Sequence, residues 1–152
     1  MASQPIFILS SGRSGTYSFY NALRDLSNIE IYHEFLFDET LRNSVSYEMK
    51  IISKKKILSY LDKSHSFSIN NSKKKIWIDS SNALPWIIQP LKEKFKKAKF
   101  IFLIRNGRKV VSSFYNKFNE IMYNKKDVLL LKRYVDKKIK HLSSEKKYWR
   151  PI

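Results

Sequence analysis

Two glycines, an arginine and several hydroxyls stand close together in the stretch SSGRSGTYS, at residues 10–18. The whole chain has three glycines, and Gly12 and Gly15 both lie here. Glycine lets a backbone bend and approach a ligand closely. A turn that leads into a helix also directs backbone N–H groups and a partial positive charge at one point. With the guanidinium of Arg13 and the hydroxyls of Ser14 and Thr16 nearby, the stretch predicts a site for a phosphate-like anion.

The spacing of this loop differs from that of the phosphate loop of ATPases and GTPases. That loop follows the pattern G-x-x-x-x-G-K-[ST], whereas no lysine follows Gly15 here. An enzyme that hydrolyses a nucleoside triphosphate with Mg²⁺ is therefore disfavoured. Taken alone, the loop also fits a tight strand-to-helix turn that holds no ligand.

A second basic stretch, KFIFLIRNGRKVVSSFYNKF, covers residues 99–118. Arg105 follows its apolar run, and Ser113 comes eight residues later, two turns into the helix that we expect next. The two side chains could bind one anion if this helix folds back over the strand. The stretch is therefore a candidate for a second anion site.

Short apolar runs alternate with segments of helical periodicity. The runs predict strands at residues 6–10, 29–32, 76–78 and 99–104. Helices are expected from Thr16, within residues 36–63, from Pro85 to about Lys97, and over residues 109–123 and 127–142. The polar residues 62–75 are expected to form a loop. This alternation predicts an α/β fold of three layers, α/β/α, with a parallel sheet covered by helices on both faces.

The polar residues that could do chemistry follow the predicted strands directly. Ligands of open parallel sheets bind outside the carboxyl ends of the strands, so we expect these residues at one edge of the sheet. In strand order they are the anion loop, then His33 and Glu34, then Asp79, Ser80 and Ser81, then Arg105. His65 and His141 fall in the polar segment and in the last helix, and both are expected at the surface.

Length and composition limit the class of protein. A chain of 152 residues suffices for one domain, expected over residues 1–152. It has no cysteine, which excludes a disulfide framework and a thiolate metal site. It also has no long apolar stretch and no secretory leader, so we expect a cytoplasmic protein with no membrane partner. The net charge of +17 favours an anionic ligand, although scattered lysine runs also fit a solvated surface.

Together, the two basic stretches resemble the PAPS-dependent sulfotransferases, whose donor is 3′-phosphoadenosine 5′-phosphosulfate (PAPS). SSGRSGTYS is similar to the family's 5′-phosphosulfate loop. RNGRKVVSSFY, at residues 105–115, is similar to its 3′-phosphate motif, in which an Arg and a Ser eight residues apart bind that phosphate. The order of the motifs and the preceding stretch KKAKFIFLIRNGR also match, and YWRPI at residues 148–152 resembles the bacterial-type members less closely.

The resemblance implies a P-loop-like sulfotransferase domain that binds PAPS, releases adenosine 3′,5′-bisphosphate (PAP) and needs no metal. It implies that Arg13 contacts the sulfuryl group and the bridging oxygen, and that Arg105 and Ser113 bind the 3′-phosphate. The loop residues implied in cofactor binding are Gly12, Arg13, Ser14, Gly15, Thr16 and Tyr17.

The implied reaction is transfer of a sulfuryl group to a hydroxyl or amine of a small-molecule or glycan acceptor. The family takes the acceptor's proton with a Glu or a His, and the position of Glu34 favours it over His33. Packing or salt-bridging roles for these two residues also fit. The polar residues 79–81 resemble a turn that lines the family's site, or else they cap a helix.

Other functions stay open at this stage. The chain could be a P-loop kinase-like enzyme, a basic module that binds a polyanion without catalysis, or a relative that binds PAP without transferring sulfate; nucleic acid is the less favoured polyanion. No Arg/Lys-Gly loop of the family follows residue 118, so we expect the C-terminal portion to be short or missing. The acceptor and the oligomeric state are not predicted.

Overall fold

The computed structural model describes the backbone of residues 3–121 and the side chains of residues 3–116. Contacts within the chain divide it into two units, Met1–Val110 and Val111–Ile152, and each is considered by itself. The helix expected over residues 127–142, His141 and the YWRPI stretch lie outside the described residues. The expectation of one domain over the whole chain stays a prediction.

The first unit is built on a parallel sheet of four strands in the order β2-β3-β1-β4. The strands are β1 (Gln4–Ser10), β2 (Ile29–His33), β3 (Ile76–Ser81) and β4 (Lys99–Leu103). All three pairs of neighbours run parallel. From β1 the chain passes to β2 at one end of the sheet, whereas β3 is followed by β4 on the other side of β1. This arrangement places the end of β1 where ligands of open parallel sheets bind.

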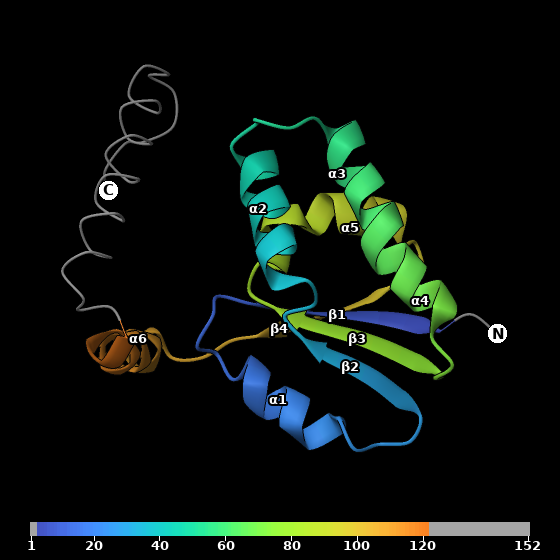
Figure 1. The fold of residues 1–152 in the computed structure, drawn as a ribbon. Helices are drawn as coiled ribbons and strands as arrows, with labels where there is room; N and C mark the ends of the chain where they lie inside the picture. The colour runs from blue at the N-terminus through green and yellow to red at the C-terminus, as the bar shows by residue number, and fades with distance from the viewer. Residues whose placement is uncertain (1–2, 122–152) are drawn as a thin grey trace. The chain divides into compact units, whose positions relative to one another are not determined.

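Helices cover both faces of the sheet, as the sequence predicts (Figure 1). Helix α1 (Thr16–Leu23) lies on one face. The other face carries α2 (Phe37–Glu48), α3 (Lys54–Leu61), α4 (Phe67–Asn71) and α5 (Ile88–Lys94). A π-helical turn (Asp62–Ser66) joins α3 to α4, a 3₁₀ turn (Leu84–Ile87) precedes α5, and α6 covers Gly107–Ile121. The prediction of an α/β fold with a parallel sheet is confirmed.

The main core lies between the sheet and helices α3 and α5. Side chains alternate between the two faces of a strand, and Phe7, Leu9 and Trp77 point into this core. Ile57, Leu61 and Leu91, together with others from the helices, fill it from the opposite side. Burying one such side chain stabilises the fold by about 1.5–3 kcal/mol. The sheet edge that carries the polar residues is therefore held by a well-packed layer.

The prediction of a polar loop over residues 62–75 holds for residues 72–75 but is wrong for residues 62–71, which are helical. Ile57, Leu61, His65 and Ile69 recur every four residues, and all four are buried. On a regular α-helix this spacing would drift by about 40° at each step. The wider π-helical turn at Asp62–Ser66 opposes that drift, so all four side chains face the core. Polar composition around this buried stripe led to the wrong prediction.

The third strand also extends further than predicted. It continues to Ser81, so Asp79 and Ser80 belong to the strand instead of ending it. Helix α5 stops at Lys94, before the expected end near Lys97, because Phe95 adopts a non-helical backbone conformation.

Among the described residues, no helix has the length and apolar character needed to cross a bilayer.

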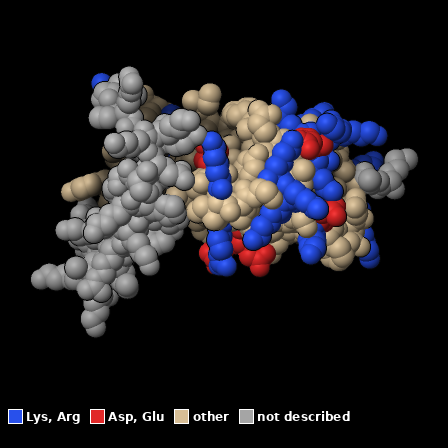
Figure 2. All heavy atoms as spheres, turned by 90° about the horizontal axis from the view of Figure 1, so that it is seen from above, with Lys and Arg blue, Asp and Glu red and all other residues tan. Residues whose placement is uncertain are grey.

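Figure 2 shows the face of the first unit that carries helices α2 to α5, where Lys and Arg outnumber Asp and Glu. Two exposed ion pairs link α5 to α3 and to the π-helical turn: Glu93 with Lys54, and Lys94 with Asp62. The positive charge on this face therefore lies largely on solvated helix surfaces, and it does not by itself indicate a binding site.

Candidate functional site

The carboxyl ends of β1, β2 and β3 bring the predicted site residues to one edge of the sheet. His33 at the end of β2 pairs in register with Ser80 of β3, which lies beside β1. Thr16 Oγ1, at the start of α1, lies 3.2 Å from His33 Nε2. The Ser80 hydroxyl donates a long hydrogen bond of 3.5 Å to the Thr16 carbonyl. The expectation that these strand ends meet is confirmed.

The loop between β1 and α1 contains an unusual run of left-handed backbone conformations. Gly12, Arg13 and Gly15 have φ angles of 77°, 52° and 107°. The Gly12 N–H donates to Ser10 Oγ at 3.3 Å, and Ser14 Oγ donates to the Gly12 carbonyl at 3.1 Å. A left-handed non-glycine residue such as Arg13 costs about 1–3 kcal/mol and is concentrated at functional sites. The loop is thus held by its own hydroxyls in a strained turn.

The N-terminus of α1 differs from those of two other helices. Ser53 accepts a hydrogen bond from the Lys56 N–H at the start of α3. Asn106 Oδ1 accepts from the N–H groups of Arg108 and Lys109 at the start of α6. Gly15 precedes α1 and has no side chain with which to cap that helix. Its first N–H groups are therefore available to an anion.

Arg105 reaches the loop from the end of β4. Its Nη1 donates a hydrogen bond of 2.9 Å to the Arg13 carbonyl oxygen. A guanidinium has five N–H donors, so this bond leaves others for an anion. The structure thus brings Arg105 of the second basic stretch to the anion loop of the first. Ser113 lies on α6 within the second unit, and its sharing of an anion with Arg105 stays a prediction.

His33 and Glu34, the two candidate bases, are neighbours at this edge. Their side chains are 26% and 24% exposed, and His33 Nδ1 lies 3.9 Å from Glu34 Oε2. The ring of Tyr17 meets the His33 ring edge-on, with 5.4 Å between centroids. Glu34 itself has a φ angle of 62°. His33 is therefore tied to the start of α1, and Glu34 stands beside it on a strained turn.

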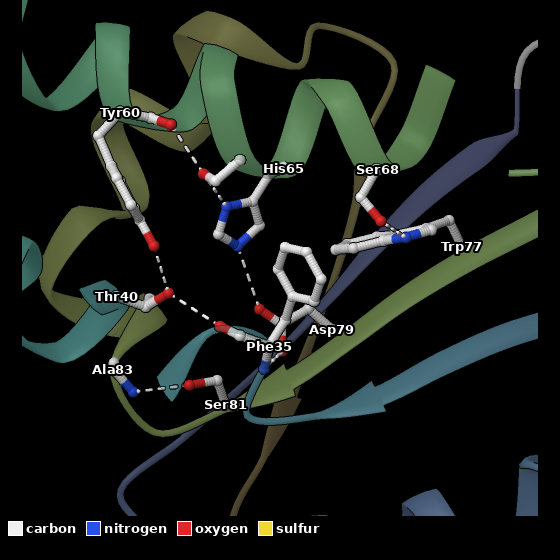
Figure 3. Close-up of polar contacts among 10 residues, drawn as sticks. Phe35, Thr40, Tyr60, His65, Ser68, Trp77, Asp79, Ser81 and Ala83 are labelled. Atoms are coloured by element: carbon white, nitrogen blue, oxygen red, sulfur yellow. Dashed lines mark hydrogen bonds and ion pairs between the residues drawn. The ribbon is translucent and has the colours of Figure 1, made fainter. Parts of the chain in front are cut away.

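The polar residues 79–81 do not form an open turn that lines the site. Asp79, Ser80 and Ser81 are fully buried within β3. Asp79 Oδ1 accepts the Phe35 N–H at 3.1 Å, and Ser81 Oγ accepts the Ala83 N–H at 3.2 Å (Figure 3). Ser81 thus holds the turn that leads to Leu84–Ile87, but it does not fulfil the alternative expectation of a helix cap, because Ala83 is the residue that precedes this 3₁₀ turn and makes no side-chain cap bond. Asp79 holds the turn behind Glu34.

His65 is not a surface residue, contrary to the prediction. Its side chain is fully buried, and Nε2 lies 3.2 Å from Asp79 Oδ2. The spacing of four residues from Leu61 and to Ile69 was the sequence signal that could have placed it in the core. Within the described ranges, no three His, Cys, Asp or Glu side chains gather in a way that could hold a metal ion.

Two comparisons with known proteins address the family of this chain. A scan against protein families matches residues 3–152 to the family described as "Sulfotransferase domain". A search of the curated proteins gives no match.

Proposed function

Because the chain belongs to the sulfotransferase domain family, we propose that it transfers a sulfuryl group from PAPS to a hydroxyl or amine acceptor. The observation that carries this proposal is the open N-terminus of α1, preceded by a glycine-containing turn and joined by Arg105. Such a turn suits a phosphate group, and a second cation at fixed separation suits a nucleotide with a second phosphate. PAPS carries both groups and supplies the sulfuryl group.

The loop residues have separate tasks in this proposal. The backbone N–H groups of residues 14–17 bind the 5′-phosphate, and Arg105 with Ser113 binds the 3′-phosphate. Arg13 lies beside the bridging oxygen, where its cation stabilises the negative charge of the leaving phosphate. Thr16 can donate its hydroxyl hydrogen to the phosphate if His33 Nε2–H donates to Thr16 Oγ1, a contact of 3.2 Å. His33 therefore orients Thr16 in this account.

Glu34 takes the proton from the acceptor in the proposed reaction. As the acceptor oxygen or nitrogen forms its bond to sulfur, the bond from sulfur to the 5′-phosphate oxygen breaks, and that oxygen keeps the electron pair. The acceptor proton passes to the Glu34 carboxylate, whose side chain is 24% exposed and so accessible from solvent. We prefer Glu34 to His33 as the base because His33 Nε2 already contacts Thr16.

Transfer of ³⁵S-labelled sulfate from PAPS to glycans, small alcohols and amines tests this function. Glu34→Gln keeps the size of the side chain but removes the base, so we expect kcat to fall by about 10²–10⁴-fold with PAP affinity retained. Arg24→Ala is a matched control, because Arg24 is an exposed residue at the far end of α1. A wild-type rate in Glu34→Gln would contradict the assignment of the base.

A non-catalytic function is the second candidate, since the net charge of +17 favours an anionic ligand whether or not the chain is catalytic. PAP binding by the wild-type chain without transfer to any acceptor would favour a PAP-binding module. A polyanion-binding module would instead bind nucleic acid with an affinity that falls steeply with salt. That affinity would be unchanged in Arg13→Ala and in Arg105→Ala.

A further inference from the structure

A buried histidine–aspartate pair lies behind the site and has no role in the proposed chemistry. His65 and Asp79 are both fully buried, with 3.2 Å between Nε2 and Oδ2. Figure 3 shows the pair between the π-helical turn and the end of β3. Burial of two polar groups is unfavourable unless their hydrogen bonds are satisfied. The partners of this pair therefore indicate what it holds in place.

The hydrogen bonds around His65 determine the donors and acceptors of the pair. Ser64 Oγ donates its hydrogen to the Tyr60 carbonyl oxygen at 2.7 Å. Its 3.0 Å contact with His65 Nδ1 must therefore use the hydrogen of Nδ1–H, with Ser64 Oγ as acceptor. A hydrogen bond between His65 Nε2 and Asp79 Oδ2 then requires one further proton between these two atoms. The pair as a whole then has no net charge, which suits its burial.

The second oxygen of Asp79 holds the backbone of Phe35. Asp79 Oδ1 accepts the Phe35 N–H at 3.1 Å, and Thr40 Oγ1 donates to the Phe35 carbonyl oxygen at 2.9 Å. The Tyr60 hydroxyl donates to Thr40 Oγ1 at 2.7 Å. Burial raises the pKa of Tyr60, so its hydroxyl keeps the hydrogen that it donates. Both polar groups of the Phe35 backbone are thus bound by side chains from other elements.

Phe35 lies between two strained residues, one of which is the proposed base. Glu34 and Leu36 have φ angles of 62° and 47°, in the left-handed region. The Glu34 N–H donates to the Ser80 carbonyl at 3.1 Å, which extends the pairing of β2 with β3 by one residue. The Phe35 ring packs against His65 and Trp77, with centroids 5.2 and 5.4 Å apart. Without these anchors the turn could relax and redirect the Glu34 carboxylate.

We propose that Asp79, itself held by His65, is a positioning residue that fixes Phe35 and thereby directs the Glu34 carboxylate toward the acceptor. The inference rests on the proposed function for the identity of the base. It assigns the buried pair to the alignment of a proton acceptor, a task in which a displacement of about 1 Å can cost about 100-fold in rate.

Asp79→Ala tests the proposal, with Asp79→Asn as the conservative variant. Asparagine keeps a carbonyl oxygen for the Phe35 N–H, and its NH₂ group can donate to His65 Nε2, so Asp79→Asn should restore the wild-type behaviour. Ser68→Ala is a matched control for loss of stability. It removes the 2.9 Å hydrogen bond from Trp77 Nε1 in the same buried layer, but it leaves the hydrogen bonds of Asp79 and Thr40 to the Phe35 backbone in place.

We expect Asp79→Ala to lower kcat by about 100-fold, with PAP affinity and acceptor KM within about two-fold of wild type. Asp79→Asn and Ser68→Ala should keep kcat within about three-fold. A wild-type kcat in Asp79→Ala would overturn the proposal. So would an equal loss of kcat in Asp79→Asn or in Ser68→Ala. If Asp79→Ala does not fold, Thr40→Val releases the other end of Phe35, and an unchanged kcat in that variant overturns the proposal.

Amide hydrogen exchange at Phe35, followed by NMR, separates this inference from the proposed function. Exchange of the Phe35 N–H should be at least tenfold faster in Asp79→Ala, or in Thr40→Val, than in wild type, and should be unchanged in Asp79→Asn. This readout needs no donor or acceptor. If the wild-type chain transfers no sulfate but Phe35 responds as described, the proposed function fails while the anchoring of the turn stands. Unchanged exchange refutes the anchoring itself.

Discussion

Gly15→Ala should lower either the stability of the fold or its affinity for the nucleotide, through the backbone of the anion loop alone. Gly15 precedes α1 with φ 107° and ψ 15°, a conformation that residues with a Cβ rarely adopt. A Cβ added there would meet no atom within 4 Å, so steric contact with the surroundings contributes nothing. The expected cost is that of a left-handed non-glycine residue, about 1–2 kcal/mol.

This cost appears in one of two measurable forms. If the loop keeps its shape, the free energy of unfolding measured with urea falls by about 1–2 kcal/mol. If the loop relaxes to avoid the strain, the N–H groups at the start of α1 no longer converge, and the Kd for PAP rises about 5–30-fold. Calorimetric titration with PAP and urea denaturation of the same samples distinguish these two outcomes.

Gly107→Ala provides the matched control. A Cβ at Gly107 would also meet nothing within 4 Å, but this glycine does not have a positive φ and begins helix α6. Alanine favours a helix over glycine by about 1 kcal/mol, so Gly107→Ala should be neutral or stabilising. If Gly15→Ala matches wild type in both stability and PAP affinity, or if both variants lose equally, the left-handed turn is not what prepares the loop.

Two further predictions concern charge and helix capping. The hydrogen bond from Lys94 holds the pKa of Asp62 below its ordinary value. This ion pair therefore stabilises the fold at neutral pH, and the contribution is lost as the pH falls below about 4. Urea denaturation at falling pH should show a slightly flatter decline for Asp62→Asn, and a steeper one would contradict the sign. Asn106→Ala removes the cap of α6 and should cost about 1 kcal/mol, whereas Asn106→Asp keeps the acceptor for the Arg108 N–H and should not.

Much of the fold was predictable because its strands are apolar and its turns are marked by polar residues. The apolar run at residues 6–10, the glycine-containing loop after it and the helical pattern that follows predict a strand, a turn and a helix in succession. The start of α1 at Thr16 and the parallel sheet followed from these patterns and are confirmed. The position of the polar residues at one edge of the sheet was predicted from the parallel topology alone, because the carboxyl ends of parallel strands meet at the same edge.

The buried polar residues were not predictable in the same way. Asp79 and His65 have polar side chains that lie inside the core only because they hydrogen-bond each other and Asp79 also accepts the Phe35 N–H. Composition assigns such residues to the surface. The four-residue spacing could have placed His65 in the core, but its pairing with Asp79 across 14 residues of chain leaves no local signal. The left-handed conformations of Arg13, Glu34 and Leu36 could not be predicted from the sequence either, since none of these residues is a glycine. They depend on hydrogen bonds and packing between elements.

The preference of the chain for PAP over adenosine 5′-monophosphate tests the central claim most directly. The two nucleotides differ by the 3′-phosphate, which Arg105 and Ser113 are proposed to bind. Charge-assisted hydrogen bonds contribute about 1.5–3 kcal/mol, so calorimetry should find PAP bound about 10–100-fold more tightly. Equal affinities for the two nucleotides, or no heat from PAP at all, would contradict the account.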